Sequence, residues 1–382
     1  MREIKNAAII GMGALGMLYA DLIIQNIGPE AVCFVADIDR VEKYKGMDFT
    51  VNGVGKHFPI VDSQEAAVAD LVIVAVKYNA LASALDTMEN CVGPETTIIS
   101  VMNGITSEEI IGERYGDEKL VYAIAQGMDA VKFGGDLNYT RPGELRIGIR
   151  DKRGNKTAVP DGSTVDGADK DVGDCKNPIG ITANACSGRG GATECGSPEN
   201  DAAEYGSPEC GSPESNAVEY GSLECGSPEY DSASRLDALT RFFTQAGISY
   251  TVEEDIMYRL WGKFMLNVGI NQTCMAFETD YGGSLEPGKT YDTLVGAMHE
   301  VMAVAHAEGI DLKEEDITFY IDLIRTLSPS GMPSMRQDGI AKRPSEVEMF
   351  SGALRKMAAK HGIPVPVNDW LYGRIKELEA GY

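Results

Sequence analysis

The chain has 382 residues, of which 43% are hydrophobic and 24% charged, values typical of a globular protein with two ordinary domains. Its formal net charge of −24 argues against nucleic acid or an anionic membrane surface as a partner. The sequence shows no secretory signal, no apolar run long enough to span a membrane and no Cys/His clusters, so we expect a cytoplasmic protein with reduced thiols and no metal.

From residue 6 to residue 150, short apolar runs alternate with segments of helical periodicity. The apolar runs suit strands that are buried on both faces of a parallel sheet. The alternation therefore predicts a doubly wound α/β domain, the Rossmann architecture. The expected strands are Ala7–Ile10, Val32–Ala36, Leu71–Val76, Thr97–Val101, Val121–Ala125 and Leu145–Ile149, and the expected helices are Gly16–Ile27, Arg40–Lys45, Ala80–Met88 and Glu108–Tyr115.

The first strand and the first helix are joined by GMGALG at residues 11–16. Gly11 allows a tight turn, Gly13 lets the backbone approach a pyrophosphate, and Gly16 lets the helix pack closely against the strand. The helix N-terminus then offers free N–H groups to the phosphates. We therefore expect a dinucleotide to be bound here by Gly11, Met12, Gly13, Ala14, Leu15 and Gly16.

Two charged residues after the second strand give opposite indications about the cofactor. Asp37 could bind a ribose 2′-hydroxyl, which favours NAD. Arg40 could hold a 2′-phosphate with its planar guanidinium, which favours NADP. Either residue could also be a solvated surface charge.

Lys77 and Asn103 follow two further predicted strands. Ligands of open α/β sheets bind at the carboxyl ends of the strands, which makes both residues candidates for the site. A solvated lysine and an Asn-Gly turn are the plain alternatives.

The composition changes between about residues 151 and 232, which are rich in Gly, Ser, Asp, Glu and Pro. ECGSPE recurs at 194–199, 209–214 and 224–229, and such a repeat has no apolar face with which to build a core. We expect a disordered acidic insertion, with a docking or regulatory element as the alternative.

After the insertion we expect a helix at Ser234–Ala246 and a strand at Ser249–Val252, and the periodicity is helical from Glu254 onward. This predicts a Rossmann domain over residues 1–253, interrupted by the insertion, and an all-helical substrate domain over 254–382. The expected helices of the second domain are Glu254–Phe277, Thr290–Glu308, Glu314–Leu327, Glu346–Lys360 and Asn368–Leu378.

Lys263, Asn267 and Asn271 lie four residues apart, so they share one face of the predicted helix. The other faces carry large apolar residues, which indicates a helix buried nearly all round. A lysine and two amides on such a helix need polar partners or a wet site. We interpret them as a proton donor and two substrate-orienting amides; an exposed polar stripe is the alternative.

Residues 333–352 contain a second candidate. Ser345 and Glu348 match an S-x-x-E capping box, which would account for Glu348 and leave Glu346 without a structural explanation. A carboxylate stabilised by the helix dipole is the plain reading of Glu346.

These motifs together resemble the ketopantoate reductase (2-dehydropantoate 2-reductase) family. GMGALG is similar to its opening GxGAxG, VAVKYNA to its lysine-bearing strand end, and VMNGI to its Asn-Gly turn. LWGKFMLNVGIN resembles its K-x3-N-x3-N helix, and SMRQDGIAKRPSEVE its Ser…Glu segment. The insertion and the absence of a further asparagine in CMAFETDYGG depart from the family pattern.

The resemblance implies an NADPH-dependent reductase that converts 2-dehydropantoate to pantoate for pantothenate and coenzyme A synthesis. NADP is then favoured over NAD, and Arg40 over Asp37. Lys263 would protonate the nascent alkoxide, and Glu346 would orient the lysine and contact the cofactor. The resemblance also assigns Arg40, Lys77 and Asn103 to the cofactor, and Asn103, Lys263, Asn267, Asn271 and Ser334 to the substrate.

Two alternatives stay open. One is a related NAD(P)H-dependent reductase of another 2-oxo acid. The other is a non-catalytic NADP-sensing protein, which would need neither Lys263 nor Glu346. A homodimer is left open.

Overall fold

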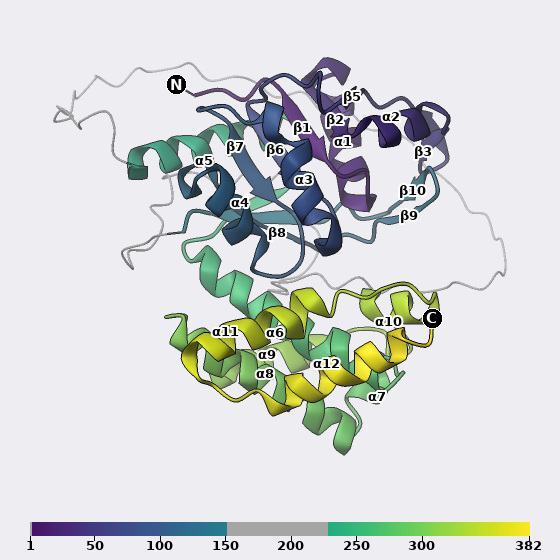
Figure 1. Ribbon diagram of the computed structural model, residues 1–382, viewed down its shortest axis with the longest axis vertical. Coiled ribbons are helices and arrows are strands. Elements are labelled where there is room, and N and C mark those ends of the chain that lie inside the picture. The colour runs from purple at the N-terminus through teal and green to yellow at the C-terminus, as the bar shows by residue number, and fades with distance from the viewer. Residues whose placement is uncertain (1, 151–227) are drawn as a thin grey trace, which may run out of the picture.

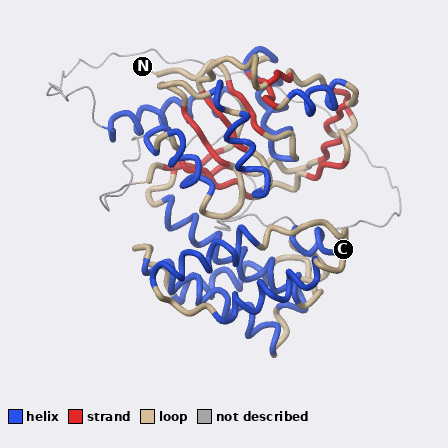
Figure 2. The backbone as a smooth tube through the Cα atoms, in the orientation of Figure 1, coloured by secondary structure: helices blue, strands red, loops and turns tan. Residues whose placement is uncertain are grey.

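The computed structural model describes residues 2–150 and 228–382, with strands in one part and a bundle of helices in the other (Figures 1 and 2). The predicted insertion at 151–232, with its repeats, lies almost entirely outside the described residues. Among the described residues no helix is long and apolar enough to cross a membrane. The predicted fold class, a parallel α/β sheet followed by a helical domain, is confirmed.

The main sheet has five parallel strands in the order β5-β2-β1-β6-β7. Its central strands are short and apolar and are buried on both faces, as expected for a sheet covered by helices. The strand order reverses direction between β1 and β6, which is where ligands bind in such sheets. The strands are β1 (Ala7–Ile10), β2 (Val32–Ala36), β5 (Ile60–Asp62), β6 (Leu71–Val74) and β7 (Thr97–Ser100).

The last two predicted strands do not extend this sheet. They are β8 (Tyr122–Gln126) and β11 (Glu144–Gly148), which pair antiparallel with each other in a separate sheet. The third strand of that sheet, β12 (Tyr250–Val252), pairs parallel with β11. The expectation of parallel strands was wrong for β8 and β11 because the connection between them contains no crossover helix. It contains instead β9 (Val131–Phe133) and β10 (Asp136–Asn138).

β9 and β10 belong to a four-stranded sheet that the sequence did not predict, in the order β4-β3-β10-β9. Its other strands are β3 (Phe49–Val51) and β4 (Val54–Lys56). Every strand in it has three residues, too few for an alternating pattern to stand out.

Helices flank the sheets and then form the second part of the molecule. The first group is α1 (Ala14–Asn26), α2 (Ile38–Lys45), α3 (Leu81–Thr87), α4 (Ser107–Tyr115) and α5 (Pro228–Gln245), the last beginning earlier than predicted. The second group is α6 (Ile256–Ala276), α7 (Tyr281–Ser284), α8 (Lys289–Ala307), α9 (Glu314–Arg325), α10 (Ser334–Ile340), α11 (Ala353–His361) and α12 (Pro366–Glu379). α7 and α10 were not predicted.

α6 is the central helix of the second part, and most of its side chains are buried. Two of its glycines permit close helix packing: a Cβ at Gly262 would lie 2.3 Å from the Tyr320 hydroxyl, and one at Gly269 2.8 Å from Met298. One hydrophobic core continues from the Rossmann strands into this helix, joining Val74 and Ile124 to Phe264. The shared core fixes α6 against the carboxyl ends of the strands.

Candidate active site

The glycine turn between β1 and α1 has the geometry of a phosphate cradle. Gly11 has φ +109°, and a Cβ there would lie 2.5 Å from the Ala75 carbonyl oxygen. A Cβ at Gly16 would lie 2.1 Å from the Gly11 carbonyl oxygen, so only glycine fits. Gly13 is the N-cap and brings no capping side chain to α1. The first turn of the helix thus leaves N–H groups available to a pyrophosphate, and the residues present fit a dinucleotide.

Asp37 and Arg40 lie together at the N-terminus of α2. The Asp37 carboxylate caps the helix by accepting the Arg40 backbone N–H at 2.9 Å. It also pairs with the Arg40 guanidinium at 3.5 Å, and about half of each side chain is exposed. Asp37 therefore has a structural role that the sequence reading did not assign to it.

Lys77 lies just after β6, two residues beyond Ala75, the residue that contacts Gly11. Its ammonium lies 3.3 Å from Oδ2 of Asp338 on α10, and Arg343 donates to Oδ1 of the same carboxylate at 2.7 Å. Asp338 is buried although both of its cationic partners are more than half exposed. It links the glycine-turn side of the site to the helical part, and no sequence motif singled it out.

The α6 face is formed as predicted. Lys263 Nζ donates to the Ala125 carbonyl oxygen at the end of β8, at 2.7 Å. Asn271 Nδ2 donates to Asn267 Oδ1 at 3.2 Å. Asn271 Oδ1 accepts from the backbone N–H of Met335 at 3.4 Å and from the Ser334 hydroxyl at 3.5 Å. The structure therefore brings Ser334 to the two asparagines.

Glu346 connects the remaining candidates. Burial raises the pKa of its carboxyl, and the charge of Asp338 adds to that rise. The charges of Lys77 and Lys263 and a hydrogen bond from Asn103 oppose it. Burial lowers the pKa of Lys263 to about 8, and the negative charges of Glu346 and Glu108 oppose this decrease. Lys77, Asn103, Lys263 and Glu346 thus form one electrostatic unit.

The predicted capping box is wrong. The Ser345 N–H donates to Glu379 at 2.7 Å, and Glu348 instead accepts from the Tyr372 hydroxyl. The Ser345 hydroxyl accepts from Val347 N–H at 3.3 Å. The helix then begins with a π-helical segment, Glu348–Gly352, a form that is frequent at functional sites.

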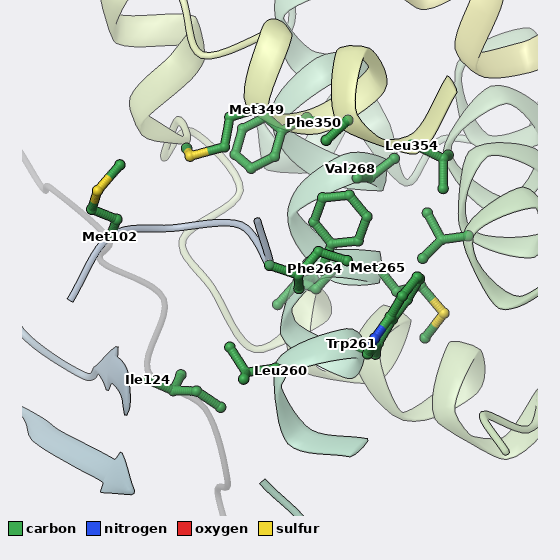
Figure 3. Close-up of a cluster of buried hydrophobic side chains, with 14 of the residues drawn as sticks. Met102, Ile124, Leu260, Trp261, Phe264, Met265, Val268, Met349, Phe350 and Leu354 are labelled. Carbon is green, nitrogen blue, oxygen red and sulfur yellow. The ribbon is translucent and has the colours of Figure 1, made fainter. Parts of the chain in front are cut away.

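Apolar side chains close the site between α6 and the strand ends (Figure 3). Beside Lys263 and Asn103 lies a cavity of about 10 Å³, room for about one water molecule. A larger ligand would therefore lie beside this cavity rather than within it. Its apolar lining is Met102, Ala123, Ile124, Leu260 and Phe264.

The comparisons with known proteins cover both parts of the chain. The family described as "Ketopantoate reductase PanE/ApbA" matches residues 7–152, and its C-terminal counterpart, "Ketopantoate reductase PanE/ApbA C terminal", matches residues 255–379. The first match ends at residue 152, at the start of the predicted insertion, and the second begins after the insertion, at residue 255.

The relatives that are similar in sequence include two 2-dehydropantoate 2-reductases. The 2-dehydropantoate 2-reductase of Vibrio cholerae is 29% identical over 149 residues, which is 39% of this chain and only 50% of that protein. The 2-dehydropantoate 2-reductase of Aquifex aeolicus is 23% identical over 97% of this chain and 96% of that protein.

A solved structure shares the fold over nearly the whole chain. The complex of D-mandelate dehydrogenase with NADH superposes with a TM-score of 0.69 at 18% identity and covers 98% of this chain and 99% of that one. At this identity the similarity concerns the fold alone.

Proposed function

Because the chain belongs to the ketopantoate reductase family, we propose that it reduces 2-dehydropantoate to pantoate with NADPH, a step of pantothenate and coenzyme A synthesis. The observation that carries this proposal is the meeting of Lys263, Asn103 and Glu346 beside a turn suited to a dinucleotide. The domain boundary after residue 253 is part of the same proposal.

A nicotinamide dinucleotide held at the turn of Gly11, Gly13 and Gly16 would supply hydride chemistry to the C2 carbonyl carbon of the substrate. Lys263 donates its proton to the carbonyl oxygen as negative charge develops there, which converts the ketone to a secondary alcohol. The Ala125 carbonyl oxygen holds the ammonium at 2.7 Å, so its position is set before the substrate arrives.

Glu346 orients the lysine and keeps it charged, because a neighbouring carboxylate stabilises the ammonium form. Asn271 is already held by Asn267, Ser334 and the Met335 N–H. The Asn267 Nδ2 group then supplies a donor for the substrate carboxylate or hydroxyl, and the Ser334 oxygen can accept a hydrogen bond from a substrate hydroxyl. Lys77, Asn103 and Arg40 would hold the cofactor.

A second candidate is the reduction of another branched or an aryl-substituted 2-oxo acid, with NADH as the alternative donor. The similarity in fold to D-mandelate dehydrogenase adds an aryl 2-oxo acid to the compounds worth testing.

The test is steady-state oxidation of NADPH and of NADH against a panel of 2-oxo acids that contains 2-dehydropantoate and phenylglyoxylate, with the product identified by mass spectrometry. We expect the highest kcat/KM for 2-dehydropantoate with NADPH, and pantoate as product. A higher value for the aryl acid would favour the second candidate. No turnover with any of the acids would refute a reductase.

A further inference from the structure

Glu108 is a buried carboxylate for which the mechanism above has no use. It is the second residue of α4, and its side chain is 1% exposed, whereas the adjacent Glu109 is exposed. Carboxylates are almost never fully buried unless they are paired, because an ionised group loses its hydration there. Its surroundings should therefore contain groups that stabilise it.

A chain of hydrogen bonds leads from Glu108 to the loop that carries Asn103. The Ser107 hydroxyl donates to Glu108 Oε2 at 2.7 Å and lies 2.9 Å from the Ser100 hydroxyl. Ser100 Oγ in turn accepts the Met102 backbone N–H at 3.4 Å. With Ser100 donating to Ser107, each hydroxyl gives one bond and accepts one, and all four residues are buried. The chain fixes the backbone immediately before Asn103.

The charge of Glu108 also acts on Lys263. The pKa of Lys263, which burial lowers to about 8, is raised by Glu346 from the helical part and by Glu108 from the Rossmann part. Burial raises the pKa of Glu108 to about 7; the bond from Ser107 and the charge of Lys263 oppose this, and Glu109 adds to it. Tyr122 on β8 also interacts electrostatically with Glu108.

We infer that Glu108 is a positioning residue of this site: through Ser107 and Ser100 it holds the backbone at Asn103, and its carboxylate is the counter-charge of the Lys263 ammonium on the Rossmann side. This inference rests on the proposed function, because that function gives Lys263 and Asn103 their roles in catalysis. The contacts of Glu108 do not depend on the proposed function. Two arms of one experiment separate the electrostatic part from the positioning part.

The electrostatic arm is an NMR titration of the full, cofactor-free chain, isotopically labelled at lysine Cε. The Lys263 signal is assigned by its loss in Lys263→Arg. Glu108→Gln keeps the volume and an acceptor for Ser107 but removes the charge, so we expect the pKa of Lys263 to fall by about 0.5 unit or more. Glu109→Gln makes the same change at the exposed neighbour, and it should leave the pKa of Lys263 within about 0.2 unit of the wild-type value. An unchanged Lys263 titration in Glu108→Gln would overturn the inference.

If Glu108→Gln does not fold, the reciprocal variant gives the same information. Coupling between two sites is mutual, so Lys263→Met should raise the pKa of the Glu108 carboxyl by an equal amount. An unchanged pKa of Glu108 in Lys263→Met would contradict the interaction between the two side chains. Neither titration needs turnover, so a failure of the proposed function leaves this result interpretable.

The positioning arm uses Ser100→Ala, which breaks the bond to Met102 but leaves the Ser107–Glu108 bond in place. We expect the Kd for NADPH, measured by quenching of tryptophan fluorescence, to rise about 3- to 10-fold, because one buried hydrogen bond to the loop is lost. The pKa of Lys263 should stay at its wild-type value in Ser100→Ala. A wild-type Kd in this variant would contradict the role of the serine chain.

Discussion

The ammonium nitrogen of Lys77 lies 3.3 Å from Oδ2 of Asp338, across 261 residues of sequence. The contact joins the strand end beside the glycine turn to helix α10, next to Ser334 and Glu346. Arg343 pairs with the other oxygen of the Asp338 carboxylate. This buried aspartate therefore holds two cations at the place where the two parts of the molecule meet.

Replacing Asp338 with Asn should lower the free energy of unfolding by about 1–2 kcal/mol, measured by urea denaturation, because both cations lose their counter-charge. The loss stays below that of a fully buried pair, since Lys77 and Arg343 are more than half exposed. Asp322→Asn, which breaks an exposed pair with Arg325, is the control and should cost at most about 0.5 kcal/mol. Equal effects of the two variants would refute a special role for Asp338.

Gly16→Ala should weaken NADPH binding at least about tenfold in a fluorescence titration. The added methyl group would lie 2.1 Å from the Gly11 carbonyl oxygen, so the turn must open. Gly373→Ala is the matched control: it lies in α12 with no atom within 4 Å of the new Cβ, and it should keep the wild-type affinity. Wild-type binding by Gly16→Ala would place the cofactor elsewhere.

Arg40→Ala should lower kcat/KM with NADPH at least about tenfold and leave kcat/KM with NADH nearly unchanged, because only NADPH has a 2′-phosphate for the guanidinium. Lys43→Ala, an exposed cation on the same helix, serves as control. If the wild-type enzyme prefers NADH, Asp37 rather than Arg40 determines the choice.

The rate should also depend on pH through Lys263. Only the ammonium form can donate a proton, so kcat/KM for reduction should fall as the pH rises through about 8. Glu346 raises the pKa of Lys263, so Glu346→Gln should shift that fall to lower pH. Glu377→Gln, on the exposed side of α12, should leave the profile in place. A profile that does not move in Glu346→Gln would argue against the pairing with Lys263.

Features with a strong local pattern could be predicted from the sequence. The spacing of Lys263, Asn267 and Asn271 placed them on one face of α6, and the glycines at 11 and 16 marked the turn. The four-residue spacing on an apolar helix and the steric needs of the turn are both local properties, so they can be read from a short stretch of sequence.

Features that depend on tertiary contacts could not be predicted. The partner of Lys77 is Asp338, which no motif connects to it. The sequence predicted a capping box between Ser345 and Glu348, but the Ser345 N–H donates to Glu379 on α12. The antiparallel pairing of β8 with β11 follows from the path of the chain between them, which short three-residue strands do not reveal.

Proton donation by Lys263 in the reduction of a 2-oxo acid is the step on which the proposed function depends. It is tested most directly by comparing kcat and the Kd for NADPH in Lys263→Ala and in Lys356→Ala, an exposed lysine on α11. We expect kcat of Lys263→Ala to fall at least about 100-fold with a Kd within about twofold of wild type, while Lys356→Ala stays unchanged. Near-normal turnover in Lys263→Ala would contradict proton donation by Lys263.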